Sequence, residues 1–327
     1  MNIVEYKNLK VSFKSEKGSI KAIDDVSFSL KKGEVLGIVG ESGSGKSVTA
    51  MSLIGLINKE AIDSESGEII FNGVNIKNFT EKQMVHIRGK EISAVYQDPM
   101  TSLNPVYSIG HQIIEGILIH EKISKKEAEK VAINMLEKVG INDAEKILKS
   151  YPSELSGGMR QRVLIAIALC LKPKVLIADE ITTALDVTIQ AQIIELLKEI
   201  REEFDMSIIV ITHDLGVIAE LCDRVLVMYC GKIVEESEIF NLFDNPKHPY
   251  TKALLESRPS IDDEFTGIKE LKTIKGSILS PYSRQEYCSF YDRCQICKQE
   301  CKQKCFPLLK QISKYQKVAC HLIGVED

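Results

Sequence analysis

The sequence predicts an α/β protein in which helices cover a largely parallel sheet that carries a phosphate-binding loop. Three observations lead to this prediction. Apolar strands alternate with an amphipathic helix between residues 163 and 235, which is typical of a parallel sheet with helices on its faces. A complete phosphate-loop motif stands between an apolar strand and a helical pattern. A helical insert over residues 109–140 separates the two α/β halves.

The elements follow from apolar periodicity and from the glycines that separate them. The first 100 residues are rich in short strands, predicted at Val26–Leu30, Glu34–Val39, Glu68–Phe71 and Ile92–Tyr96. The insert holds two helices, Ile109–His120 and Lys125–Val139. The second half alternates the strand Val175–Ala178, the helix Thr188–Phe204, the strand Ser207–Thr212 and a hairpin of Val225–Tyr229 with Lys232–Glu235.

Composition limits the possible classes. The chain has 327 residues, 44% of them hydrophobic, and a net charge of −4, so it can bury a sizeable core and does not look like a nucleic-acid binder. The start of the chain carries no signal pattern. The longest strongly apolar stretch, Val163–Leu171, is shorter than the roughly 20 residues that a membrane helix needs. A role at a membrane would therefore require docking on other chains.

The phosphate loop is the segment Gly40–Ser47, which fits G-x-x-x-x-G-K-[ST] completely. It follows the strand Glu34–Val39 and precedes the helical pattern Val48–Leu56. Glycines allow backbone N–H groups to face phosphate oxygens, and the helix N-terminus favours negative charge. Lys46 can reach the β- and γ-phosphates of ATP, and the Ser47 hydroxyl can bind Mg²⁺. The expected contact residues are Gly40, Ser42, Gly43, Ser44, Gly45, Lys46, Ser47 and Val48.

Two carboxylates end the apolar strand Val175–Ala178. An acidic residue at such a strand end lies beside the phosphate loop in sheets of this kind, where it can hold Mg²⁺. We therefore expect Asp179 to bind Mg²⁺ and Glu180 to polarise the attacking water.

Residues Leu155–Met159 match the signature LSGGQ except that Met159 replaces glutamine. With this segment just upstream of Asp179, the sequence resembles the ATPase subunits of ABC transporters. The resemblance implies that Ser156, Gly157 and Gly158 contact the nucleotide of an opposite subunit across a dimer. It also implies the full fold: an ABC-type nucleotide-binding domain with a mixed sheet core, an antiparallel β subdomain and a helical subdomain at about 98–165.

Further family positions match one by one. Gln97 resembles the glutamine that senses Mg²⁺ and couples to membrane subunits, and His213 resembles the switch histidine near the γ-phosphate. Thr183–Asp186 resembles the loop that touches the opposite subunit, and Phe13 stands where an aromatic ring stacks on adenine. Ile181 departs from the usual proline after the glutamate, which affects the local turn more than the chemistry.

Longer segments resemble the dipeptide and oligopeptide importers of this family: Tyr96–Pro105, Thr182–Gln190 and His248–Thr251. The resemblance implies a peripheral subunit on the cytoplasmic face of the cell membrane that hydrolyses ATP to power peptide import. Its partners would be a second, different ATPase subunit, two membrane permease subunits and an external peptide-binding protein. Import of nickel or another solute is an alternative, and a non-transport ABC ATPase is a more distant one.

Six of the nine cysteines lie in the last 40 residues. Without a secretion signal, such a cluster indicates metal binding more than disulfides. Cys288, Cys294, Cys301 and Cys320 fit the tail pattern of the importer branch, and four thiolates suit a [4Fe–4S] cluster or Zn²⁺. The irregular spacing favours the cluster, while Cys297 and Cys305 are alternative ligands. We thus expect an ATPase domain over 1–258 and a cysteine-rich extension over 259–327.

Overall fold

A computed structural model describes residues 1–96, 99–183, 186–257, 273–277, 279, 282 and 286–324. These residues form two compact units. The first consists of Met1, Leu30–Val35 and Asn78–Ile211, and the second of Asn2–Ser29, Leu36–Lys77 and the described part of Thr212–Asp327. The domain boundary expected near residue 258 falls outside the described residues, but the described part of the extension belongs to the same unit as the phosphate loop.

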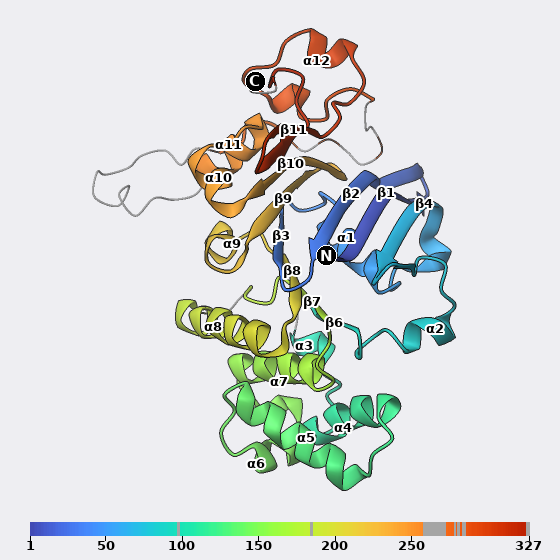
Figure 1. The fold of residues 1–327 in the computed structure, drawn as a ribbon, viewed down its shortest axis with the longest axis vertical. Helices are drawn as coiled ribbons and strands as arrows, with labels where there is room; N and C mark the ends of the chain where they lie inside the picture. The colour runs from blue at the N-terminus through green and yellow to red at the C-terminus, as the bar shows by residue number, and fades with distance from the viewer. Residues whose placement is uncertain are drawn as a thin grey trace, which may run out of the picture. The chain divides into compact units, whose positions relative to one another are not determined.

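Three parallel strands form the sheet of the first unit, in the order β8-β7-β6 (Figure 1). Their bounds are β6 (Ile92–Val95), β7 (Val175–Asp179) and β8 (Ser207–Ile211). Every residue of β7 and β8 is buried, as expected for apolar strands of a parallel sheet. Helix α8 (Val187–Phe204) buries Ile193, Leu197 and Ile200, whose spacing places them on one helix face.

The predicted insert is a group of helices that pack on one another in the first unit (Figure 1). Its members are α4 (Ile109–His120), α5 (Lys125–Lys138), α6 (Ala144–Lys149) and α7 (Gly157–Leu169), and the short helices α2 (Glu81–Val85) and α3 (Pro99–Ser102) precede them. Serine caps set the helix starts. Ser108 accepts a hydrogen bond from the His111 N–H, and Ser124 forms a capping box with Glu127.

The second unit contains a four-stranded sheet in the order β2-β1-β4-β5. The strands are β1 (Asn2–Ser15), β2 (Gly18–Lys31), β4 (Ile62–Phe71) and β5 (Val74–Asn75). β4 pairs antiparallel with both β1 and β5, which confirms the antiparallel sheet that the family resemblance implied. Tyr6 from β1 is buried, and its hydroxyl donates to the Thr49 carbonyl at 2.8 Å, so this sheet is tied to the helix after the phosphate loop.

A second set of strands in this unit runs in the order β11-β12-β10-β9-β3. β3 (Val35–Val39) is parallel to β9 (Arg224–Tyr229), whereas β9 and β10 (Lys232–Glu238) are antiparallel. The extension adds β12 (Gln316–Val318) and β11 (Lys310–Ser313) beyond β10. The helices of the unit are α1 (Lys46–Leu53), α9 (Leu215–Leu221), α10 (Ile239–Asp244), α11 (Pro249–Glu256) and α12 (Glu300–Gln303).

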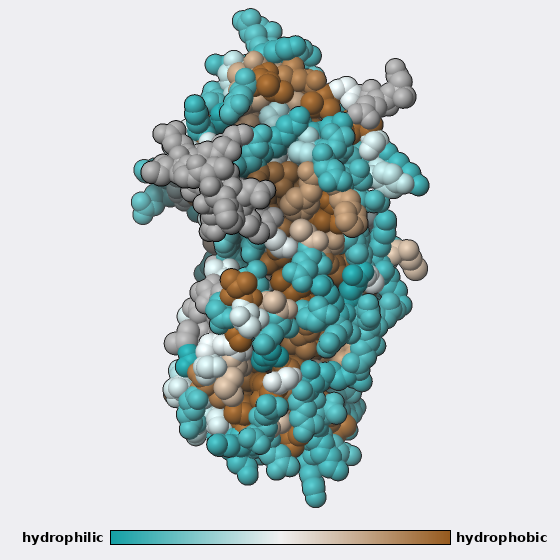
Figure 2. Space-filling model, turned by 90° about the vertical axis from the view of Figure 1, so that its left-hand side faces the viewer, coloured by the Kyte–Doolittle hydropathy of each residue, from teal (hydrophilic) through white to brown (hydrophobic). Residues whose placement is uncertain are grey.

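The face drawn in Figure 2 is largely hydrophilic, with apolar areas interspersed. In the first unit, apolar side chains are exposed on and just before α4: Val106 (71% exposed), Tyr107 (47%), Leu118 (39%) and Ile119 (63%). Isolated exposed apolar residues are ordinary, whereas these four belong to one helix and the residues just before it.

Candidate nucleotide site and cysteine-rich extension

The phosphate loop connects β3 to α1 and is held close to β9. Gly40 has φ 150°, and a Cβ added to it would lie 2.1 Å from the Met228 carbonyl oxygen. Gly45 caps α1 at φ 103°, and its Cβ would lie 2.7 Å from the Ala22 carbonyl oxygen. Both positions therefore require glycine, because any side chain would collide with neighbouring backbone. The sequence places glycines where the fold brings two backbones together.

Lys46 is buried and closes the loop on itself. Its Nζ donates to the carbonyl oxygens of Gly40 at 2.7 Å and of Glu41 at 3.1 Å. The Ser44 hydroxyl is buried and has no hydrogen-bond partner among the described residues. A buried hydroxyl without a partner costs free energy unless a ligand or a water satisfies it, which makes Ser44 a candidate contact for a bound ligand. Ser42, Gly43 and Ser47 are exposed, and Val48 is half-buried.

His213 and Phe13 also belong to the second unit. The N–H of Thr212 donates to the carbonyl of Ile38, the residue before Val39 at the end of β3. His213 follows directly and is exposed, so it lies near the strand that leads into the phosphate loop. Phe13 is half-buried in β1 opposite Ile62.

The carboxylates Asp179 and Glu180 stand at the carboxyl edge of the sheet in the first unit. Asp179 ends β7 opposite Ile211, and it is buried. Glu180 adopts a left-handed conformation, φ 50°, and its N–H donates to the Ile211 carbonyl at 2.8 Å. Burial raises the pKa of Tyr96, the residue after β6, an effect opposed by Arg88 and reinforced by the Asp179 charge. The next residue, Gln97, lies outside the described residues.

The signature segment forms the start of α7. Ser156 is exposed, and its hydroxyl accepts a hydrogen bond from the Met159 N–H at 3.3 Å. Gly157 is exposed and Gly158 half-buried, and a Cβ on Gly158 would lie 3.4 Å from Ile189 in α8. Met159 contributes its backbone N–H to the cap, so the exchange of glutamine for methionine leaves this start intact. Ala184 and Leu185 of the predicted dimer-contact loop lie outside the described residues.

The cysteines predicted to share a site do converge. Cys288, Cys294, Cys301 and Cys320 line one small cavity of about 10 Å³, together with Cys297 and apolar residues such as Phe290. Burial, reinforced by the neighbouring thiols of Cys320, Cys294 and Cys301, raises the pKa of Cys288 to about 12. Nevertheless, no three His, Cys, Asp or Glu side chains among the described residues form a group that could hold a metal ion. The cavity has room for about one water molecule, so a cluster would require the thiols to move apart.

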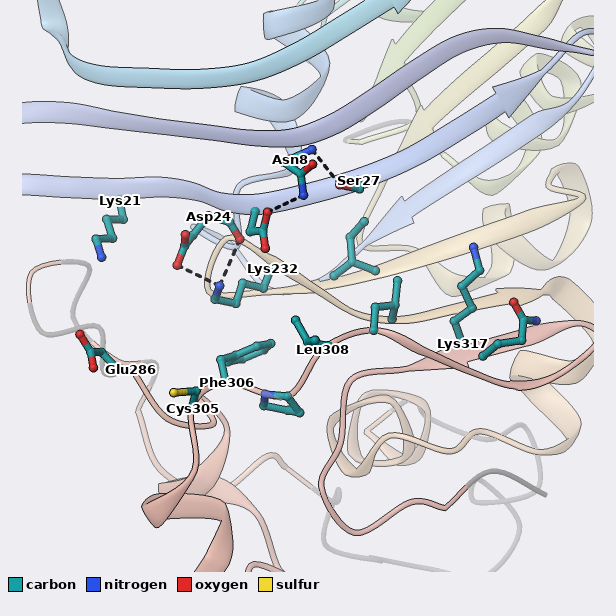
Figure 3. Close-up of a pocket in the computed structure, with 15 residues that line it drawn as sticks. Asn8, Lys21, Asp24, Ser27, Lys232, Glu286, Cys305, Phe306, Leu308 and Lys317 are labelled. Carbon is teal, nitrogen blue, oxygen red and sulfur yellow. Dashed lines mark hydrogen bonds and ion pairs between the residues drawn. The ribbon is translucent and has the colours of Figure 1, made fainter. Parts of the chain in front are cut away.

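Cys305 lies apart from that cavity, in a groove of about 790 Å³ between the extension and strands β2 and β10 (Figure 3). Lys232 crosses this groove, 2.9 Å from the Asp24 carboxylate and 4.7 Å from the centre of the Phe306 ring (Figure 3). Burial alone would raise the pKa of Asp24, but the hydrogen bond and charge of Lys232 lower it overall. The extension is therefore anchored on Lys232 as well as through β12.

Sequence reasoning missed one contact of the phosphate loop. The guanidinium of Arg293, in the extension, lies against the Glu41 carboxylate in the loop. A single arginine between two cysteines carries no sequence signal for a contact 252 residues away.

None of the helices in the described part of the chain combines the length and apolar character that a bilayer crossing requires.

Comparison with known protein families agrees with this geometry. Residues 23–183 match the family described as "ABC transporter", and residues 234–301 match "Oligopeptide/dipeptide transporter, C-terminal region". The chain belongs to the ABC transporter family and is an ATP-binding cassette ATPase of it, so the resemblance predicted from the motifs is confirmed.

Individual relatives are ATP-binding proteins named for peptide transport. The oligopeptide transport ATP-binding protein AppD of Bacillus subtilis (strain 168) is 50% identical over 91% of this chain and 90% of its own length. OppD of the same organism, also an oligopeptide transport ATP-binding protein, is 53% identical over 84% of this chain and 76% of its length. The dipeptide transport ATP-binding protein DppD, also of Bacillus subtilis (strain 168), is 49% identical over 89% of this chain and 86% of its own length.

Solved structures show the same fold. The dimeric ATP-binding cassette MJ0796 in a post-hydrolysis state, bound to ADP and phosphate, matches with a TM-score of 0.65 and 28% identity over 72% of this chain and 98% of that one. CbiO1 from Clostridium perfringens is part of the ABC transporter complex cbiONQ. It matches with a TM-score of 0.63 and 29% identity, over 75% of this chain and 91% of that one.

Proposed function

We propose that this protein is the ATP-hydrolysing subunit of an importer for dipeptides or longer peptides. Nucleotide binding is supported by the conformation of the phosphate loop. There Lys46 donates hydrogen bonds to carbonyl oxygens of the loop, and the buried Ser44 hydroxyl has no partner among the described residues. Relatives about half identical to the chain are named for oligopeptide and dipeptide transport, and they support the choice of substrate.

In this proposal the loop binds the phosphates of ATP, with Lys46 moving from the loop carbonyls to the β- and γ-phosphates. Ser47, Asp179 and Gln97 would hold Mg²⁺, and Phe13 would stack on adenine. Glu180 accepts a proton from the water that attacks the γ-phosphorus, the bond to the ADP oxygen breaks, and His213 stabilises the transferred phosphoryl group. Bound Mg²⁺ would neutralise charge on the phosphates.

The partners in this proposal are a second ATPase subunit, two membrane permeases and an external peptide-binding protein, with this chain on the cytoplasmic face of the membrane. Ser156, Gly157 and Gly158 would complete the site of the second subunit, for which the exposed start of α7 is suited. The apolar side chains exposed around α4, including Val106 and Ile119, would contact a permease.

The cysteine cavity is proposed to hold a [4Fe–4S] cluster on Cys288, Cys294, Cys301 and Cys320. Convergence of these thiols with an apolar wall supports this proposal, since thiolates are the ligands that iron–sulfur clusters and zinc prefer. A bound cluster would cross-link the extension. Anaerobically purified protein should show broad visible absorbance and about four irons per chain. One zinc per chain without this absorbance would show that the thiols bind zinc and not a cluster. Absence of both metals would refute the proposal.

The transport function is tested by coexpressing the chain with candidate permeases and measuring ATP-driven peptide uptake into vesicles. Glu180→Gln should leave MgATP binding intact and lower turnover at least about a hundredfold, because the water loses its base. Glu202→Gln, an exposed carboxylate of α8, is the matched control and should leave turnover unchanged. Wild-type hydrolysis in Glu180→Gln would refute the role of that residue. Uptake of nickel in place of peptides would refute the substrate assignment.

A further inference from the structure

The extension reaches the phosphate loop through one arginine. Arg293 forms a two-pronged contact with Glu41: Nη1 lies 2.6 Å from Oε2, and Nη2 lies 2.9 Å from Oε1. The Arg293 side chain is only 5% exposed and that of Glu41 23%. Paired N–H donors facing both oxygens of a partly buried carboxylate give a directional contact that water competes for poorly.

Arg293 is fixed from the other sides as well. Nη1 also donates to the Tyr229 hydroxyl at 3.2 Å, Nη2 to the Ile274 carbonyl at 3.4 Å, and Nε to the Lys275 carbonyl at 3.2 Å. All five N–H groups of the guanidinium thus have a partner. The carbon of the guanidinium lies 5.8 Å from the centre of the Tyr229 ring. These other contacts fix the position of the guanidinium, so its orientation toward Glu41 does not depend on Glu41 alone.

Glu41 is the loop residue through which such a contact can act on nucleotide binding. Its N–H donates to the Tyr250 hydroxyl at 2.9 Å, and its carbonyl accepts from Lys46 Nζ at 3.1 Å. The same carbonyl accepts the N–H of Ser44 at 3.2 Å. A shift of Glu41 would therefore move the carbonyl that holds Lys46 and the turn that carries Ser44.

The backbone of Arg293 is set by the cysteines on either side of it. Arg293 ends the 3₁₀ turn Tyr291–Arg293. The Tyr291 N–H donates to the Cys288 carbonyl at 3.0 Å, and the Cys294 N–H donates to the Tyr291 carbonyl at 3.2 Å. Both cysteines line the cavity described above, so their thiols and the Arg293 side chain extend from the same short turn.

We propose that Arg293 is a positioning residue of the phosphate loop and that the cysteine-bearing turn Cys288–Cys294 regulates nucleotide affinity through its contact with Glu41. The inference rests on the proposed function, since it takes the loop as the ATP site. It assigns the extension a regulatory role: a change in how the Cys288 and Cys294 thiols pack around their cavity changes how tightly the loop holds MgATP.

The test is a double-mutant cycle on the purified full chain, read as the Kd for MgATP. Arg293→Gln and Glu41→Gln should each raise the Kd about tenfold, within the range typical of coupling between sites, and the double variant should be no weaker than either. Arg293→Lys keeps the charge but loses the paired N–H donors of the guanidinium, so its Kd should lie between those of wild type and Arg293→Gln. Lys304→Gln removes an exposed ion pair with Glu300 in the extension and is the matched control, which should leave the Kd unchanged.

The regulatory part is tested by Cys288→Ser, which should raise the Kd in the wild-type background and have no further effect in Arg293→Gln. Additive effects, or wild-type affinity in Arg293→Gln and Glu41→Gln, would overturn the inference. If Arg293→Gln fails to fold by thermal melting, Glu41→Gln and Arg293→Lys report on the same contact. Failure of the wild-type chain to bind MgATP would instead refute the proposed nucleotide site, so the two failures can be distinguished.

Discussion

Gln316 in β12 donates its side-chain amide to the carboxylate of Glu235 in β10 at 2.7 Å, and both side chains are buried. The same carboxylate accepts the backbone N–H groups of Lys247 at 2.9 Å and His248 at 2.8 Å. One buried side chain thus joins the ATPase sheet, the segment that starts α11 and the strand contributed by the extension. Buried carboxylates persist in proteins only with such partners, so this one ties the extension into the fold.

Replacing Glu235 by alanine should lower the free energy of unfolding by about 3 kcal/mol, because the N–H groups of buried His248 and half-buried Lys247 and the buried Gln316 amide all lose this acceptor. Urea unfolding followed by circular dichroism measures the change. Glu238→Ala alters an exposed carboxylate at the end of the same strand and should shift stability by less than about 0.5 kcal/mol. Equal stability of the two variants would mean that the buried hydrogen bonds contribute nothing net.

Gly40→Ala should abolish measurable MgATP binding and destabilise the second unit by about 2 kcal/mol, since the new methyl group would lie 2.1 Å from the Met228 carbonyl oxygen. Gly73→Ala is the control, because Gly73 also has positive φ, 79°, but no atom lies within 4 Å of its added Cβ. It should cost only the conformational strain of about 1 kcal/mol and spare binding. Calorimetric titration and thermal melts separate the two effects, and normal binding by Gly40→Ala would show that the loop tolerates a displaced start.

Ser156→Ala should lower stability by about 1 kcal/mol, since α7 loses its N-cap. If the signature acts on the nucleotide of a partner subunit, the same change should strongly reduce ATP turnover of the assembled transporter while MgATP binding by the isolated chain is unchanged. Ser124→Ala removes the comparable cap of α5 and should match the stability loss without the loss of turnover. Parallel losses of turnover in both variants would point to helix stability alone.

The nine cysteines should differ widely in reactivity. Burial raises the pKa of the Cys170 thiol to about 12, so near pH 8 it stays protonated and unreactive toward iodoacetamide, whereas Cys297 and Cys305 are exposed. Mass spectrometry should find Cys297 and Cys305 alkylated first in metal-free protein, and Cys170 only after unfolding. Because the pKa of Cys170 is higher in the folded state, its contribution to stability is present below about pH 9 and is lost as the pH rises toward 12. Early alkylation of Cys170 would indicate local opening of α7.

Much of the fold was predictable because its elements carry strong local patterns. The helix predicted at Ile109–His120 has these bounds in the structure, and that predicted at Thr188–Phe204 begins one residue earlier. Both have apolar residues at helical spacing and polar caps, which act within a few residues of chain. The buried strands β7 and β8 were predicted to within one residue for a similar reason: they are short, continuous apolar runs.

The missed elements are those whose conformation depends on a partner strand. β1, fourteen residues long, interleaves charged and apolar residues and has two register shifts against β4, so its pattern is weak. β11 and β12 are four and three residues long, and β12 exists as a strand through its pairing with β10. Short segments have little intrinsic preference for the extended state, which sheet neighbours supply.

By itself the sequence determined the class of protein. The glycines and Lys46 of the phosphate loop, the serine and glycines at the start of α7, and the acids after β7 define local geometries that need only adjacent residues. Tertiary structure alone decided what the extension does within its unit. It brought Arg293 to Glu41 across 252 residues and gathered five cysteines around one cavity. Contacts of that kind depend on which distant segments meet, and apolar periodicity shows which face of an element is buried but not which residues lie against it.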